Sequence, residues 1–205
     1  SKSAVEKIIV LRNPSCPVLN KMIYSKTNTI LFAGSIQSQK GYIDLIRAFA
    51  QIAPEFPDWQ LVFAGSGEIN KAEKVVRDFN LENKVVFKGW VSGIEKDKCF
   101  KQANVFCLPS YAEGLPMAIL DAWSYDLPVI TTPVGSIKDI GIDGENMLLF
   151  QPGNIEALAS RIKLMIQDKE LQKTIVKNAK VLIEKEFSLE VIAEDLKRIY
   201  TNHIK

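Results

Sequence analysis

Histidine is almost absent from this chain of 205 residues, and features that identify several common classes of protein are missing as well. The single histidine, His203, lies two residues before the C-terminus, so no catalytic histidine is expected within this chain. The three cysteines, Cys16, Cys99 and Cys107, are an odd number without C-x-x-C spacing. This pattern predicts a reducing, cytoplasmic compartment and argues against a metal site.

Neither a strong net charge nor a long apolar run is present. The chain has 26 Lys and Arg residues against 24 Asp and Glu residues, and the basic residues are spread among the acidic ones. A formal net charge of +2 therefore gives no reason to expect nucleic acid as a partner. No apolar stretch approaches the length of a membrane span. An apolar share of 47% and a charged share of 24% instead indicate a globular domain with one core.

From Thr29 onward, short apolar runs alternate with segments of helical periodicity. Strands are predicted at residues 30–33, 59–64, 84–87, 105–108, 128–131 and 147–150, and helices at residues 41–53, 69–79, 95–103 and from residue 116. Unbroken apolar strands separated by helices are typical of parallel strands covered on both faces. We therefore predict an α/β fold, a Rossmann-like doubly wound parallel sheet of about six strands flanked by helices. Helices alone are predicted after Gly153, at residues 155–167, 169–186 and 188–202.

The start of the chain differs from this regular alternation. Residues 7–11 (KIIVL) have the composition of a strand, but no helical pattern precedes them. We therefore expect the chain to be a piece of a longer protein.

Residues 105–126 (VFCLPSYAEGLPMAILDAWSYD) combine a strand, a turn of small residues and an apolar helix. Asp121 is the only charged residue between Leu115 and Trp123, and a carboxylate in a buried helix needs a partner. Glu113 lies eight residues earlier, in the turn before the helix. Free N–H groups at residues 114–117 and the helix dipole suit an anionic ligand, so a nucleotide site is predicted here. The alternative is that Glu113 only caps the helix while Asp121 faces a buried arginine or a solvent channel.

Two standard nucleotide fingerprints are not found at the neighbouring turns. The residues from Gly34 to Gly41 lack the Gly-Lys-Ser/Thr order of a P-loop, and Gly65-Ser66-Gly67 lacks the third glycine of a dinucleotide site. Lys40 nevertheless lies before a helix, in a turn that follows a predicted strand. Like the turn that carries Glu113, it is therefore expected at the carboxyl ends of the strands, where its charge can bind a phosphate. The alternative is an ordinary solvated lysine.

Four blocks in order resemble one family, the GT-B glycosyltransferases of family 4, in their C-terminal nucleotide-sugar-binding domain. They are residues 30–41 (ILFAGSIQSQKG), 61–67 (LVFAGSG), 85–91 (VVFKGWV) and 108–123 (LPSYAEGLPMAILDAW). The last block resembles the P-S-x-x-E-G-x-P signature with its pair of carboxylates eight residues apart. The resemblance runs from about residue 13 to the C-terminus and implies one half of a GT-B fold for residues 1–205.

The resemblance implies a retaining transfer of a sugar from a nucleotide diphosphate donor. It assigns Lys40 and position 35 to the diphosphate, Asp121 to the ribose, and Glu113 to the donor sugar as the catalytic carboxylate. It also implies that backbone N–H groups at residues 114–117 contact the phosphates. The implied donor-binding residues are Gly34, Ser35, Lys40, Gly65, Trp90, Val91, Glu113, Gly114, Leu115, Pro116, Met117 and Asp121, with the backbone of Trp90 and Val91 meeting the base.

Two residues depart from the family pattern. Ser35 stands where the family has an arginine, which removes one cation from the diphosphate site. Asp121 stands where the family has a glutamate, so the ribose must lie closer or be reached through water.

The resemblance also implies partners and a missing part. The partners are a UDP- or GDP-linked sugar and a saccharide or lipid-linked acceptor, with no metal and no other cofactor. The family's N-terminal acceptor domain is not in this chain, and membrane association would lie in that domain, at the inner face of the membrane. We therefore expect this chain to bind nucleotide and to transfer little or no sugar. Two alternative hypotheses for the function are a non-catalytic nucleotide-binding scaffold and an epimerase of similar architecture.

Overall fold

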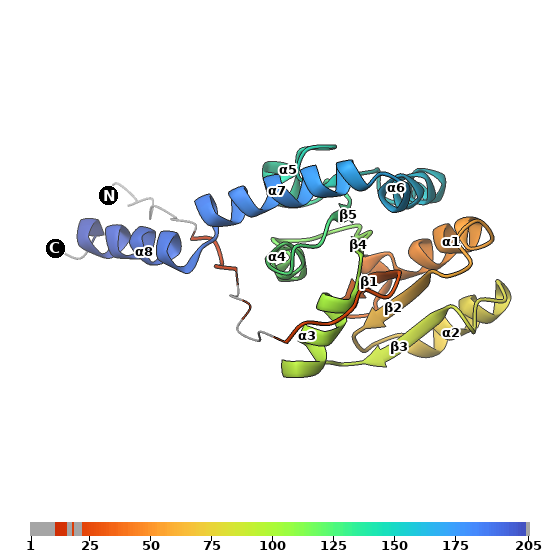
Figure 1. Ribbon diagram of the computed structural model, residues 1–205. Helices are drawn as coiled ribbons and strands as arrows, with labels where there is room; N and C mark the ends of the chain where they lie inside the picture. Colours follow the sequence, from red (N-terminus) through yellow and green to blue (C-terminus); the bar gives the residue numbers. More distant parts are fainter. Residues whose placement is uncertain (1–10, 16–17, 19–21, 204–205) are drawn as a thin grey trace.

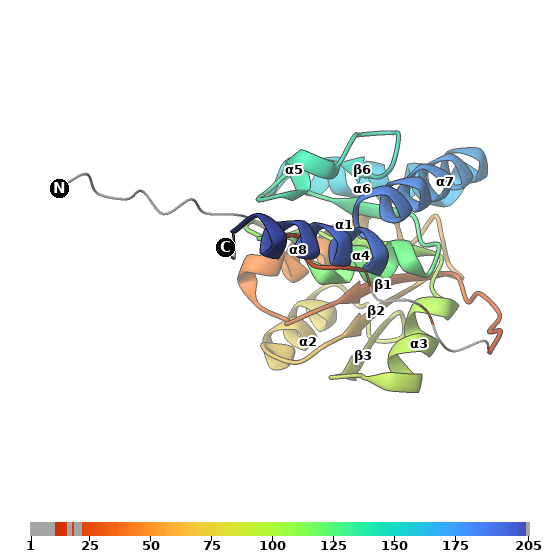
Figure 2. The same cartoon turned by 90° about the vertical axis from the view of Figure 1, so that its left-hand side faces the viewer.

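The computed structural model describes residues 11–15, 18 and 22–203. Within them the chain forms a six-stranded parallel sheet with the order β3-β2-β1-β4-β5-β6, which Figure 2 shows from β3 at the bottom to β6 at the top. The strands are β1 (Thr29–Ala33), β2 (Gln60–Ala64), β3 (Val85–Gly89), β4 (Val105–Leu108), β5 (Val129–Thr131) and β6 (Leu148–Leu149). The predicted doubly wound α/β sheet is confirmed.

Helices cover both faces of the sheet, as right-handed crossovers between parallel strands require. They are α1 (Tyr42–Ile52), α2 (Ile69–Asp78), α3 (Gly93–Gln102), α4 (Met117–Ser124), α5 (Ile137–Ile140), α6 (Ile155–Gln167), α7 (Lys169–Glu186) and α8 (Leu189–His203), with a short 3₁₀ helix η1 (Ser38–Lys40). In Figure 1 the sheet is seen nearly edge-on, with α1, α2 and α6 on one side and α3, α4 and α5 on the other. The molecule therefore has three layers.

The central strands β1 and β4 determine where a ligand can bind. All four residues of β4 are buried, and β1 is buried over its first four residues, so this pair lies in the middle of the core. The chain runs outward to one edge through β2 and β3, then crosses back to β4 beside β1. At such a reversal the loops after the two neighbouring strands diverge and leave a crevice at the carboxyl ends. The turns that follow β1, β2, β3 and β4 all open onto this edge.

The differences from the predicted boundaries are local. Trp59 precedes β2 instead of opening it, because its N–H donates to the carbonyl of Phe56 in a turn, at 3.1 Å. Helix α3 begins at Gly93 rather than at residue 95, directly after Ser92 in extended conformation. The strand predicted at residues 7–11 lies outside the described part except for Leu11, which has no regular structure.

The C-terminal helices α6 and α7 have the predicted bounds because each begins at a side-chain cap. The Asn154 carboxamide accepts from the N–H of Ala157 at 2.9 Å, and the Asp168 carboxylate accepts from the N–H of Leu171 at 2.8 Å. Helix α7 then packs against α4, whereas α8 extends away from the sheet (Figure 1). None of the helices in residues 22–203 is long and apolar enough to cross a membrane.

Candidate functional site

The loops that follow β1 and β4 are joined into one unit at the carboxyl edge of the sheet. The N–H of Tyr111 donates to the carbonyl of Gln39 at 2.8 Å, and the Gln39 carboxamide donates to the carbonyl of Ala112 at 3.0 Å. Gly41, with a φ of 69°, approaches this loop so closely that a Cβ atom there would lie 2.0 Å from the Pro109 carbonyl oxygen. The glycine thus allows the first turn of α1 to contact the loop that carries Glu113.

Lys40 and Glu113 form an ion pair across these two loops. The Lys40 ammonium lies 2.6 Å from one carboxylate oxygen of Glu113 and 2.7 Å from the other, and the Ser110 hydroxyl donates to the same carboxylate at 2.6 Å. The Glu113 side chain is only 6% exposed. The simple alternatives are therefore wrong: Lys40 is not a free solvated lysine, and Glu113 does not cap α4, whose N-cap position is Pro116.

Asp121 also has a cationic partner, and the sequence analysis did not identify this residue. The ammonium of Lys96, on α3, lies 2.7 Å from the Asp121 carboxylate, on α4. The predicted need for a partner is confirmed, and the partner is a lysine instead of the arginine or solvent channel considered as alternatives. The only sequence signal was the spacing of Lys96 and Phe100, which places both on one face of α3. Nothing in the sequence linked that face to Asp121.

A cleft of about 560 Å³ opens at the reversal point and is lined by the ends of β1 and β2, the loop after β3, and helices α3 and α4. The backbones after β1 and β2 lie close together at this end of the cleft, because a Cβ atom at Gly65 would lie 1.8 Å from the Gly34 carbonyl oxygen. Six of the predicted donor-binding residues line this cleft: Gly34, Ser35, Gly65, Trp90, Val91 and Asp121. The indole of Trp90 is exposed at the cleft.

The other six predicted residues, Lys40, Glu113, Gly114, Leu115, Pro116 and Met117, lie in the ion pair described above and in the turn that leads into α4. Among the described residues, the backbone N–H groups of Gly114, Leu115 and Met117 have no acceptor. These groups lie at the N-terminal end of α4, where the helix dipole is positive, and Asp121 is on this helix. The arrangement suits an anion between the Lys40–Glu113 pair and the cleft.

The nearby tyrosines and cysteines are poorly suited to act as bases or nucleophiles. Burial and the hydrogen bond that Tyr42 donates to Glu68 raise the pKa of this tyrosine to about 12. The hydrogen bond from Tyr111 to Asp44 likewise raises the Tyr111 pKa, and burial raises the pKa of the Cys107 thiol. The described part of the chain holds no group of three or more His, Cys, Asp or Glu residues arranged to bind a metal. The charged pairs Lys40–Glu113 and Lys96–Asp121 are better suited to contact a ligand at this edge.

A doubly wound sheet with a cleft at the reversal of strand order defines the Rossmann-like class of α/β domains. Within that class, residues 20–182 match the family described as glycosyl transferases group 1, and the chain belongs to this family.

One curated relative and two solved structures are similar to this chain, and the structures share its fold. The capsular polysaccharide biosynthesis glycosyltransferase CapM of Staphylococcus aureus is 30% identical over 176 residues, which make up 85% of this chain and 46% of CapM. The crystal structure of Anabaena HepE in complex with UDP-glucose has a TM-score of 0.79 at 22% identity, covering 86% of this chain and 49% of that one. The crystal structure of the C-terminal domain of the group 1 glycosyl transferase LpcC from Francisella tularensis has a TM-score of 0.73 at 22% identity, covering 85% and 96%. This chain spans about half the length of the curated relatives that it matches.

Proposed function

We propose that this chain is the C-terminal, nucleotide-sugar-binding domain of a GT-B glycosyltransferase of family 4. The complete protein would transfer a sugar from a nucleotide diphosphate donor to a saccharide or lipid-linked acceptor, with retention at the anomeric carbon. The observation that carries the proposal is the placement of Asp121 in the wall of the cleft, on the same helix whose free N–H groups adjoin the Lys40–Glu113 pair. The Asp121 carboxylate, the free N–H groups and the Lys40–Glu113 pair thus follow one another in the order of ribose, diphosphate and sugar in a donor.

Each part of the donor has a place in this arrangement. The base would lie against the backbone of Trp90 and Val91 at the open end of the cleft, and the ribose hydroxyls would donate to Asp121. The diphosphate would accept from the N–H groups of Gly114, Leu115 and Met117, with Lys40 supplying a positive charge. Glu113 would then contact hydroxyl groups of the sugar.

In the proposed reaction the bond between the anomeric carbon and the diphosphate oxygen breaks, and a bond from an acceptor hydroxyl oxygen to that carbon forms. The acceptor proton leaves with the diphosphate, whose charge increases as the bond breaks. N–H groups and a cation that are already in place stabilise this charge without reorganisation. Lys40, freed from Glu113 as the carboxylate engages the sugar, has the charge required for this role. The proposed step uses no metal or organic cofactor.

The position of the chain within its protein is part of the proposal. Coverage of 96% of a solved C-terminal domain, against 44–56% of three curated relatives, supports a domain that binds the donor and relies on another for the acceptor. Groups from both sides of a cleft are needed to orient the two substrates. We therefore expect the chain alone to release no more UDP from UDP-sugars in the presence of acceptors than the Glu113→Gln variant releases. Faster release by the unmodified chain would contradict the proposal that transfer requires a second, acceptor-binding domain.

We place the reaction in the cytoplasm, in the synthesis of a polysaccharide or glycolipid. The thiols of Cys99 and Cys107 are free, which fits a reducing compartment. The name of CapM, which refers to capsular polysaccharide biosynthesis, supports this type of product. Association with a membrane that carries a lipid-linked acceptor would come from the remaining half of the protein.

Titration calorimetry with UDP, GDP and ADP tests the proposed donor site. We expect saturable binding with a preference for one base. Asp121→Ala should weaken binding of the preferred nucleotide about 10-fold or more, because it removes charge-assisted hydrogen bonds to the ribose.

Glu113→Gln is the matched control, since it also neutralises a carboxylate but one assigned to the sugar. Binding of the free nucleotide by this variant should be unchanged or tighter, because Lys40 is released from its ion pair. If no nucleotide binds at millimolar concentration to this chain or to the complete protein, the proposed function is wrong. Equal losses in the two variants would contradict the separate roles of the carboxylates.

A further inference from the structure

Lys96 is the one cation among the described residues that line the cleft. The lining residues include two charged side chains, Lys96 and Asp121, and the remainder are small, polar or apolar. Lys40 lies outside this set, and both oxygens of Glu113 are bound to its ammonium. Ser35, at the end of β1, lines the cleft without charge. Among the lining residues that the structure describes, Lys96 is therefore the positive side chain that an anionic ligand meets inside the cleft.

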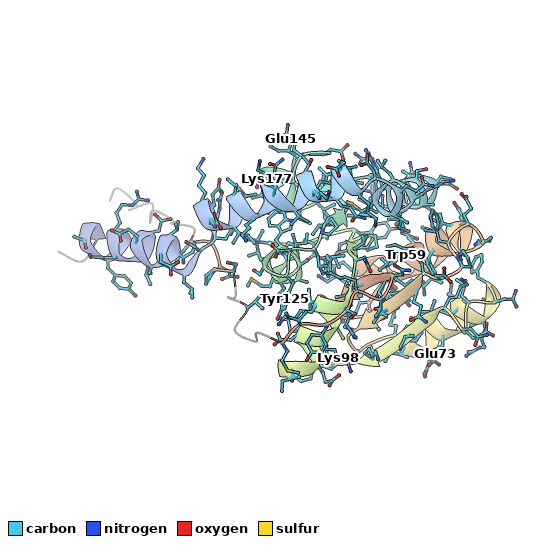
Figure 3. All side chains as sticks on the ribbon, viewed as in Figure 1. Trp59, Glu73, Lys98, Tyr125, Glu145 and Lys177 are labelled. Carbon is cyan, nitrogen blue, oxygen red and sulfur yellow. The ribbon has the colours of Figure 1, made fainter. Side chains whose placement is uncertain are left out.

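The structure holds Lys96 in place from several sides. Its ammonium lies 2.7 Å from Asp121 and 5.7 Å from the centre of the Phe100 ring. Helix α3 is in turn fixed to the end of α4, because Tyr125 stacks on Phe100 and donates a hydrogen bond to Asp97. Figure 3 shows Tyr125 between these two helices. The position of the ammonium against the cleft is thus set by packing and not by chance contact.

The position is electrostatically unfavourable for the helix itself. Lys96 is the fourth residue of α3, near the end where the helix dipole favours anions over cations. The Lys96 side chain is 35% exposed, whereas that of Asp121 is 12% exposed. The ammonium is therefore more accessible from the open cleft than the carboxylate it contacts. A cation at this place contributes little to α3, but it increases the attraction of the cleft for a negative charge.

We propose that Lys96 is a donor-binding residue that exchanges partners: Asp121 holds its ammonium in the free protein, and the first phosphate of the nucleotide takes the ammonium when the ribose hydroxyls occupy Asp121. This inference rests on the proposed function and adds a specific contact to it. The exchange keeps both charges paired in each state, since a buried carboxylate without a partner is costly. It also couples recognition of the ribose to recognition of the phosphate.

The test is titration of uridine, UMP and UDP against the unmodified chain and Lys96→Met, with the guanosine series instead if GDP is the preferred diphosphate. Lys96→Met should bind uridine as well as or better than the unmodified chain, because Asp121 loses a competing partner. UMP and UDP should each bind about 10-fold more weakly, since one charge-assisted contact is lost. The salt dependence of UMP binding should also decrease.

Two further variants complete the test. Lys98→Met removes the same charge from an exposed position on the same helix (Figure 3) and should leave all three affinities unchanged. Ser35→Arg in the Lys96→Met background should recover UMP affinity, because it restores a cation to the cleft from the end of β1. Thermal unfolding of each variant checks that the fold is retained.

The outcomes separate the inference from the proposed function. Equal losses for uridine and UMP would mean that Lys96 only orients Asp121, and no loss, or a loss seen with UDP alone, would also overturn the contact to the first phosphate. In those cases binding by the unmodified chain leaves the proposed function intact. Absence of binding by the unmodified chain and by the complete protein would overturn both.

Discussion

Replacement of Gly135 by alanine is expected to destabilise the protein and to abolish nucleotide binding. Gly135 has a φ of 55°, and a Cβ atom there would lie 1.9 Å from the Glu113 carbonyl oxygen and 2.8 Å from that of Gly114. These atoms belong to backbone, so neither can swing aside. The unfavourable backbone conformation and the overpacking together should lower the free energy of unfolding by about 2–5 kcal/mol.

The same substitution would displace the part of the site that meets the diphosphate. The N–H of Ser136 donates to the Gly114 carbonyl at 3.1 Å, so the segment after β5 positions the turn before α4. If that turn moves away from a new methyl group, the Glu113 carboxylate and the free N–H groups of Gly114, Leu115 and Met117 move with it. Nucleotide binding should therefore fall below detection even in the fraction that remains folded.

Gly144→Ala provides a matched control for Gly135→Ala. Gly144 also has a positive φ, 77°, but no atom lies within 4 Å of the position of its Cβ atom. This substitution should cost about 1 kcal/mol from the backbone conformation alone and leave binding unchanged. Urea unfolding and titration with UDP measure both effects. Similar values for the two variants would show that the close approach of Gly135 to the Glu113 loop has no role in the site.

The sequence was most informative where a local pattern decides the structure. Helices α6 and α7 were predicted with their observed bounds from their helical periodicity, and in the structure Asn154 and Asp168 cap them through bonds to residues three positions away. The parallel order of the sheet was predictable for a related reason, since unbroken apolar strands separated by helices permit few arrangements. The shared sheet edge of the turns at residues 34–41, 65–67 and 109–114 followed from that order.

The contacts between distant residues were not predictable from local patterns. Lys96 is 25 positions from Asp121 in the chain, and its role appears only when α3 and α4 are packed together. From the sequence, Gly135 is likewise indistinguishable from an ordinary turn glycine. Its contact with Glu113 depends on the segment after β5 folding back onto the segment after β4. Burial of the Lys40–Glu113 pair is a third such feature. In each case the deciding quantity is a distance between two loops or helices, which sequence spacing does not encode.

Breaking the Lys40–Glu113 pair from the lysine side should lower stability strongly. Lys40→Met leaves Glu113, at 6% exposure, with the Ser110 hydroxyl as its remaining partner in the described structure. A nearly buried carboxylate without a counter-charge should cost about 2–3 kcal/mol in the free energy of unfolding, reduced from the fully buried case because Lys40 is itself 23% exposed.

Adding Glu113→Gln to Lys40→Met should restore much of this stability, because the neutral carboxamide can still accept from Ser110 and no longer needs a cation. Urea unfolding of the two single variants and the double variant then gives a coupling energy, expected to be about 2 kcal/mol. The Lys173–Glu170 pair is a control with a nearly equal separation, 2.7 Å, but with side chains 73% and 82% exposed. Its coupling should stay below about 0.5 kcal/mol. If the two pairs couple equally, burial does not strengthen the Lys40–Glu113 contact, and the free chain does not hold Glu113 in the position from which it would meet the sugar.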